Sequence, residues 1–314
     1  MAVKKELAEF LHVFHQITIP ELLAKGYKPT PVNSREALAN LTGAMVTEIV
    51  EVPQIYDDIV PARGYCVPVR IYNPNPAEAL PVLMNFHGGG FMVGSVSVYD
   101  ALSRKLAMRT QHIVAAVEYR LAPECPYPAG MIDGYNATRH IWSVLDARGI
   151  RHRRELSMFG DSAGGGMCAY IAARAQHDRD MDIKSQILLY PGLDFTMGTE
   201  SMRQLGNNYF LTTTRIRYYY ENLFQHNEDR YAESPLHGFF GKGMPPTLVI
   251  TAGYDPLKDE GRLYAEKTQA AGVPTEYVCM ENMIHAFMNM EKLAAEETET
   301  LYALVRKFLE KTWQ

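Results

Sequence analysis

A serine lies at the centre of a short glycine-rich motif, Gly160-Asp161-Ser162-Ala163-Gly164. An apolar run at 156–159 precedes the motif, and small and apolar residues at 167–173 follow it. A strand, a sharp turn and a helix in this order would hold the Ser162 hydroxyl out at the end of a sheet, because the glycines let neighbouring backbone approach closely. Such a serine can act as a nucleophile, although the same residues also fit a flexible turn without chemistry.

A serine nucleophile needs a base to accept its proton and a carboxylate to orient that base. His285 follows the apolar run at 275–280 after a short loop, where a base would leave the last strand of a sheet. His237 lies instead in a polar segment before Met244, where no predicted strand end would hold it. We therefore expect His285 to be the base.

The carboxylate should leave the strand that precedes this base. The run at 246–254 reads as a strand and ends directly before Asp255. Asp259 lies before Glu260 and a helical pattern, so it fits a charge in the first turn of a helix better. Asp194 is a weaker candidate, because it follows an earlier strand. We expect Asp255 to orient the base.

Backbone donors for an oxyanion are predicted after another apolar run, at 82–86. The sequence continues as His87-Gly88-Gly89-Gly90, and consecutive glycines let N–H groups reach a substrate oxygen. We expect Gly88, Gly89 and Ala163 to form the oxyanion hole, and His87 to brace the loop. A phosphate-binding loop is disfavoured, because no Gly-Lys-Ser/Thr follows and no Gly-x-Gly-x-x-Gly opens a helix.

The composition narrows the class of protein. The 314 residues are 47% hydrophobic and 21% charged, as in globular proteins with a sizeable core. A net charge of −5 argues against nucleic-acid binding. The N-terminal segment lacks the apolar core of a signal peptide and no long apolar span follows, so we expect a cytoplasmic protein without a stable membrane anchor. The cysteines are far apart, which predicts free thiols, no metal site and no cofactor.

Strand-like and helix-like segments alternate along most of the chain. This alternation predicts a mostly parallel, eight-stranded sheet with helices on both faces. Two strands, at 45–50 and 65–72, should pair antiparallel, with Pro68 favouring an edge position for the second. The other strands are expected at 82–86, 113–117, 156–159, 187–190, 248–251 and 277–280, and the helices near 98–110, 129–147, 164–176, 258–271 and 290–311.

Two segments fall outside this alternation. The N-terminal segment has helical patterns at 3–23 and 34–41, with Ser34 as the expected N-cap of the second. A later segment is too long for a simple crossover and holds a helix candidate at 212–225, followed by an expected loop at 231–246. We expect this later segment to be an inserted cap over the carboxyl end of the sheet.

In this order, the motifs resemble those of the hormone-sensitive lipase-like family of α/β-hydrolases, also called bacterial family IV carboxylesterases. The resemblance implies an α/β-hydrolase fold and supports Asp255 as the acid. Ala286 stands where the family usually has glycine, and Cys125 where it often has histidine, but neither change removes a catalytic group. The matching stretches are His87-Gly88-Gly89-Gly90-Phe91, Glu118–Glu124, Gly160-Asp161-Ser162-Ala163-Gly164-Gly165, Asp255–Gly261 and Met283–Phe287.

The resemblance also implies that the N-terminal segment and the later insertion together form a cap. This divides the chain into a cap at 1–45 and 195–240 and a core at 46–194 and 241–314, with an apolar substrate pocket between them. The alternative for any single candidate is that it packs the cap helix. The candidates to line the pocket are Tyr190, Leu193, Phe195, Tyr209, Phe210, Leu211 and the cluster Tyr218–Tyr220.

The predicted function is that of a serine carboxylesterase that hydrolyses short- to medium-chain acyl esters through an acyl-enzyme intermediate. The partner would be a small-molecule ester, and activity should fall at acid pH as His285 becomes protonated. The alternatives are an amide or arylacetamide deacylase with the same site, and a catalytically silent relative that binds a small ligand. The presence of Ser162, Asp255 and His285 disfavours the silent relative. We also consider a homodimer through the last strand and helix.

Overall fold

One eight-stranded sheet forms the centre of the computed structural model, which describes residues 2–62 and 64–312. The strands are β1 (Gln54–Ala62), β2 (Tyr65–Asn73), β3 (Leu80–Phe86), β4 (Ile113–Val117), β5 (His152–Asp161), β6 (Ile183–Leu189), β7 (Thr247–Tyr254) and β8 (Thr275–Ile284). Their order across the sheet is β1-β2-β4-β3-β5-β6-β7-β8. β2 pairs antiparallel with β1 and β4, and the remaining neighbours are parallel. The predicted mostly parallel sheet of eight strands is confirmed.

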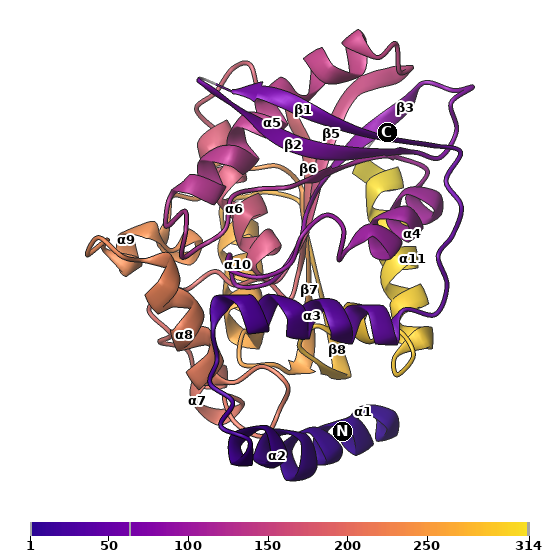
Figure 1. The fold of residues 1–314 in the computed structure, drawn as a ribbon. Helices are drawn as coiled ribbons and strands as arrows, with labels where there is room; N and C mark the ends of the chain where they lie inside the picture. Colours follow the sequence, from indigo (N-terminus) through magenta and orange to yellow (C-terminus); the bar gives the residue numbers. More distant parts are fainter. Residues whose placement is uncertain (1, 63, 313–314) are drawn as a thin grey trace.

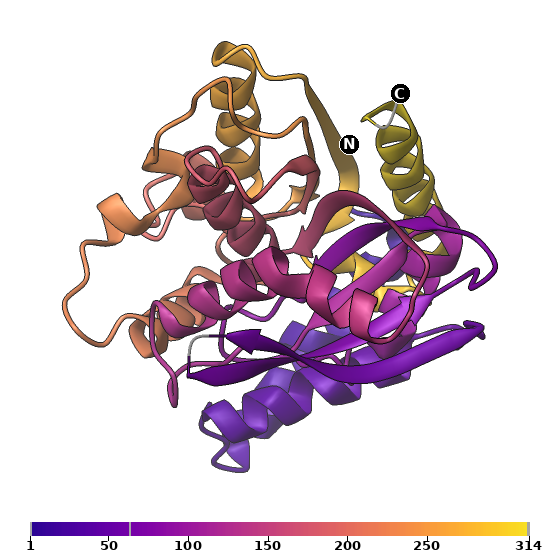
Figure 2. The same cartoon turned by 90° about the horizontal axis from the view of Figure 1, so that it is seen from above.

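Helices cover both faces of this sheet, as Figure 1 and the view from above in Figure 2 show. The long helices are α3 (Pro31–Met45), α4 (Asp100–Thr110), α5 (Ala129–Ala147), α6 (Ala163–Ala175), α8 (Thr213–Leu223), α10 (Lys258–Ala270) and α11 (Ala295–Thr312). The shorter ones are α1 (Lys5–Val13), α2 (Ile19–Ala24), α7 (Glu200–Gln204), α9 (Arg230–Glu233), the π-helical turn η1 (Phe14–Thr18) and the 3-10 turns η2 (Pro235–His237) and η3 (Phe287–Met290). α5, α6 and α10 pack on one face, and α4 and α11 on the other.

The central strands are buried on both faces, which explains why their sequences are nearly continuous apolar runs. Every residue of β3 and β4 is buried. Met84 belongs to the core under α5 and α6, whereas Leu83, its neighbour on the strand, belongs to the core under α4 and α11. Two apolar layers therefore hold the sheet in place. Because β3 to β8 are parallel, their carboxyl ends lie at the same edge.

The strand predicted at 45–50 is wrong, because the first strand is β1. β1 contains Asp57 and Asp58, two charged residues that are uncommon in a buried strand. At the edge of a sheet, however, charged side chains can reach solvent. There they form ion pairs with Arg70 at 2.7 Å and with Arg148. The edge position predicted for β2 is also wrong, since β2 pairs on both sides; Pro68 lies just beyond its ladder with β4.

The N-cap predicted at Ser34 is also wrong, because α3 begins earlier. Thr30 caps the helix by accepting a hydrogen bond from the Asn33 N–H at 3.2 Å, and the Asn33 side chain accepts one from the Thr30 N–H at 2.7 Å. Pro31 occupies the first turn, where its missing N–H costs nothing. The expected loop at 231–246 also contains most of α9 and all of η2.

Helices from the N-terminal segment and from the segment after β6 meet beyond the carboxyl ends of the parallel strands. Figure 1 shows α1, α2, α3, α7 and α8 there. The rings of Phe10 and Phe14 lie 6.1 and 5.7 Å from that of Phe210. The His15 Nε2 lies 3.2 Å from the Tyr209 carbonyl oxygen. Two segments far apart in sequence therefore form one layer over the sheet. Within the described ranges, every helix is too short or too polar to cross a lipid bilayer.

Candidate active site

Ser162 occupies a strained turn between β5 and α6. Its φ of 53° and ψ of −118° lie outside the regions that L-residues prefer, which costs about 1–3 kcal/mol. The flanking glycines make this turn sterically feasible. A Cβ on Gly164 would lie 1.9 Å from the Phe86 carbonyl oxygen, and one on Gly160 would lie 2.2 Å from that of Gly164. The turn therefore presents the serine hydroxyl beyond the end of β5.

The structure brings the three predicted triad residues into one hydrogen-bonded line. The Ser162 Oγ lies 2.9 Å from His285 Nε2, and His285 Nδ1 lies 2.7 Å from Asp255 Oδ2. Asp255 is fully buried after β7, and its other oxygen accepts the Leu257 N–H at 2.8 Å. With Nδ1–H donating to this carboxylate, Nε2 is left to accept the serine proton. The arrangement can therefore raise the nucleophilicity of Ser162.

The residue after His285 is Ala286, where the family usually has glycine, and the loop keeps the backbone conformation that glycine would favour. Ala286 has φ 62° and ψ 25°, a left-handed conformation that glycine adopts freely and alanine at a cost. Tyr190 packs behind the imidazole with ring centroids 4.7 Å apart. The chain thus adopts the turn that glycine would favour, and His285 keeps its place.

The competing candidates are engaged elsewhere. The Asp259 carboxylate accepts the Ser201 N–H at 2.8 Å and so ties α10 to α7. Asp194 accepts the Thr196 N–H at 2.9 Å and lies 3.3 Å from His237 Nε2. Asp194 and His237 therefore pair with each other rather than with Ser162.

The oxyanion prediction needs one correction. The Gly88 N–H donates to Asp161 Oδ1 at 2.7 Å, so it is not free to bind a substrate oxygen. Gly89, Gly90 and Ala163 instead line the same cavity as Ser162. The sequence could not show this, because the direction of the first glycine's N–H depends on a carboxylate 73 residues away.

That carboxylate, Asp161, is buried beside Ser162. Its second oxygen accepts a hydrogen bond from the Tyr99 hydroxyl at 3.2 Å. Burial raises the pKa of Asp161 to about 7, although the Gly88 N–H and the nearby His285 act in the opposite direction. Asp161 therefore links the turn at Ser162 to the glycine loop.

His87 braces the glycine loop from inside, as expected. Its Nδ1–H donates to the Gly88 carbonyl at 2.8 Å, and the Tyr119 hydroxyl donates to the His87 carbonyl at 2.7 Å. Burial lowers the pKa of His87 to about 4, so the ring is neutral at pH 7. The loop conformation is thus held by neutral hydrogen bonds on its buried side.

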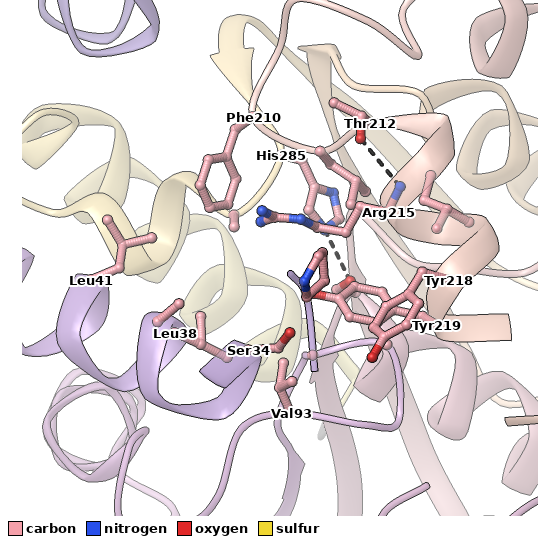
Figure 3. A pocket seen from close by; sticks show the side chains of 18 of the residues that line it. Ser34, Leu38, Leu41, Val93, Phe210, Thr212, Arg215, Tyr218, Tyr219 and His285 are labelled. Carbon is pink, nitrogen blue, oxygen red and sulfur yellow. Dashed lines mark hydrogen bonds between the residues drawn. The ribbon is translucent and has the colours of Figure 1, made fainter. Parts of the chain in front are cut away.

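A mostly apolar cavity of about 660 Å³ opens onto Ser162 and His285. Figure 3 shows Leu38 and Leu41 of α3 on one side and Tyr218 and Tyr219 of α8 on the other. Helices α1 and α2 close a further side. The lining includes Phe10, Val13, Phe14, Leu22, Tyr27, Ala37, Phe210, Leu211, Arg215, Ile216 and Tyr220.

Only two of the six single pocket candidates, Phe210 and Leu211, line this cavity. The other four pack behind its wall, so their predicted place in the lining is corrected. Tyr190, Leu193 and Phe195 are at most 1% exposed in the core, and Tyr209 packs against Tyr254 with ring centroids 5.2 Å apart. Phe195 packs behind α8, with its ring 5.2 and 5.0 Å from those of Tyr220 and Phe224, which is the alternative of packing the cap helix.

Sequence reasoning named no lining residue in the N-terminal helices, which supply much of the wall. Phe10 and Phe14 are four residues apart and therefore share one face of the helix, with rings stacked 5.7 Å apart. That spacing was the available signal. Arg215 was not predicted to line the cavity, because no pattern in the neighbouring sequence indicates that its side chain faces one.

Residues 83–289 match a family described as having the alpha/beta hydrolase fold, so the chain belongs to the α/β-hydrolases and, within them, to the hormone-sensitive lipase-like group. It is 33% identical to carboxylic ester hydrolase LipN of Mycobacterium tuberculosis, over 84% of this chain and 74% of that protein. It is 33% identical to an ethyl acetate hydrolase of Pseudomonas putida, over 77% and 78% of the two chains. An esterase structure from Pyrobaculum calidifontis superimposes with a TM-score of 0.86 at 30% identity, over 98% and 99%.

Proposed function

We propose that this protein is a serine carboxylesterase that hydrolyses short- to medium-chain acyl esters of small molecules. The observation that carries the proposal is the line Ser162–His285–Asp255, with contacts of 2.9 and 2.7 Å, at the wall of an apolar cavity. The relatives named as ester hydrolases support the same class of reaction.

In the first step, the Ser162 oxygen attacks the ester carbonyl while His285 Nε2 accepts its proton. Asp255 stabilises the imidazolium that forms. The N–H groups of Gly89, Gly90 and Ala163 are the donors that we assign to the oxyanion. His285 then protonates the departing alcohol and leaves an acyl group on Ser162.

In the second step, His285 takes a proton from water, which attacks the acyl group. The acid leaves and the proton returns to Ser162, so the enzyme is regenerated. Because a neutral imidazole is required in both steps, activity should fall on the acid side.

The cavity supports a limit on acyl length. Its wall is formed by α1–α3 and α8. We assign the segments that carry these helices, 1–45 and 195–240, to a cap over the core at 46–194 and 241–314. A cavity of about 660 Å³ has the volume of a typical small-molecule site. Rates on 4-nitrophenyl esters of two to twelve carbons should therefore peak at short or medium chains. Wild-type rates equal to those of Ser162→Ala across the series would refute the proposal.

A further inference from the structure

Arg215 brings a guanidinium into this mostly apolar cavity. Arg215 lies in the first turn of α8, where its backbone N–H donates to the Thr212 Oγ1 at 3.2 Å. Figure 3 shows its side chain extending toward Phe210, and its Cζ lies 5.8 Å from the centre of that ring. Among the described residues that line the cavity, Arg215 is the only arginine or lysine.

Within the described parts of the chain, the Arg215 guanidinium forms no ion pair and donates no side-chain hydrogen bond. This differs from Arg120, which binds both oxygens of Asp133 at 2.7 and 2.8 Å. Asp161 is the one carboxylate in the described lining of the cavity, and its oxygens already accept from Gly88 and Tyr99. The cation therefore lacks a counter-charge from the protein.

An unpaired cation beside apolar walls loses hydration without an equivalent return, and an anionic ligand would supply that return. The guanidinium suits a carboxylate especially well, because its planar donors match the two carboxylate oxygens. Ser34 and Thr214 place hydroxyl-bearing residues in the same lining. The cavity thus combines an apolar wall with one site of positive charge.

We propose that Arg215 binds a free carboxylate of the substrate, so that the preferred esters are anionic, such as half-esters of dicarboxylic acids. This inference rests on the proposed esterase function and names its substrate class. The reaction remains ordinary hydrolysis, in which the half-ester anion and water give the dicarboxylate, the alcohol and one proton. The carboxylate at Arg215 takes no part in bond breaking and only positions the ester carbonyl at Ser162.

The test compares two esters of the same shape: monoethyl adipate, and the neutral ester in which an isopropyl group replaces the free carboxylate. In the wild type, the ratio of kcat/KM for the anionic ester to that for the neutral ester should exceed the ratio in Arg215→Met by roughly 10- to 100-fold, the worth of a charge-assisted hydrogen bond. Monoethyl glutarate and monoethyl suberate cover other chain lengths.

Arg217→Met is the matched control, because Arg217 is exposed on the same helix and lies outside the described cavity lining. It removes the same charge, so a general electrostatic effect would lower the ratio equally in both variants. The inference predicts that Arg217→Met leaves the ratio unchanged. Equal ratios in the wild type and Arg215→Met for all three half-esters would overturn it.

Binding measured by calorimetry in a Ser162→Ala background separates this inference from the proposed function. Monoethyl adipate should bind Ser162→Ala roughly 10- to 100-fold more tightly than it binds Ser162→Ala with Arg215→Met. If the wild type hydrolyses neither these esters nor the 4-nitrophenyl series, the esterase proposal fails while this binding difference still decides the role of Arg215. If binding is equal in the two proteins, Arg215 is not a carboxylate site.

Discussion

At the scale of single residues, the buried carboxylate of Asp255 governs how His285 can act. It accepts the Nδ1–H at 2.7 Å and so leaves Nε2 facing Ser162. Asp255→Asn preserves the shape but removes the charge and favours the wrong tautomer, so kcat for a 4-nitrophenyl ester should fall by roughly 10⁴-fold.

Asp259→Asn is the control for this prediction, because Asp259 lies four residues after Asp255 but its carboxylate accepts the Ser201 N–H and does not contact His285. Its kcat should stay within a few-fold of the wild type, and circular dichroism should show both variants folded. Equal losses in the two variants would contradict the assignment of the acid.

Asp161 should make stability depend on pH. Its pKa of about 7 in the folded state lies above the value of about 4 in an unfolded chain, so the folded state binds more protons between these values. The free energy of unfolding therefore decreases as pH rises from about 4 toward 7, because the unfolded chain loses this proton more readily than the folded protein does. Asp161→Asn cannot ionise, and its stability relative to the wild type should increase from pH 5 to pH 8, by up to roughly 3 kcal/mol.

Urea unfolding of both proteins across this pH range measures the difference directly. Asparagine keeps an oxygen that can accept the Gly88 N–H, so the comparison mainly reports the charge. A difference between the two proteins that does not change with pH would mean that Asp161 titrates alike in the folded and unfolded states.

At the scale of elements, a buried ion pair ties the segment after α3 to α4 and to the loop after η3. Lys105 of α4 and Glu291 are 2% and 4% exposed and pair with each other. The Glu291 carboxylate also accepts the Thr47 N–H at 2.8 Å, and the Lys105 ammonium donates to the Thr47 hydroxyl at 3.0 Å. Glu291 lies a few residues after His285, so this pair supports the loop that carries His285 from outside the cavity.

Lys105→Met should lower the free energy of unfolding by about 3–5 kcal/mol, because it leaves the Glu291 charge buried without its partner. The double variant Lys105→Met with Glu291→Gln should recover part of this loss, since no charge then remains. Chemical denaturation of the single and double variants measures the coupling. A double variant less stable than Lys105→Met would show that the buried charge is not the cause.

The elements differed in how far their sequences could predict them. β3 and β4 are buried on both faces, so continuous apolar runs marked them. β1 carries Asp57 and Asp58, which only its edge position tolerates, and its sequence pointed to the wrong segment. Ser162, Asp255 and His285 could be picked from chain order, but the role of Gly88 depended on Asp161, a contact made only by the folded chain.

At the scale of the whole molecule, the sheet and the helices above it perform separate tasks. β5, β7 and β8 end at the same edge and deliver Ser162, Asp255 and His285 there. The cavity above them is shaped by α1–α3 and α8, which come from segments far apart in sequence. Their apolar residues look alike whether they face a core or a cavity, so the lining, including Arg215, emerged only from the folded arrangement.

The central claim is that Ser162 is the nucleophile of an active hydrolase, and a fluorophosphonate probe tests it most directly. The probe reacts with activated serines, and peptide mass spectrometry can locate its adduct. The wild type should carry one adduct on Ser162, and Ser162→Ala should remain unlabelled under the same conditions. A folded wild type that stays unlabelled, or that carries its adduct on another residue, would contradict the account.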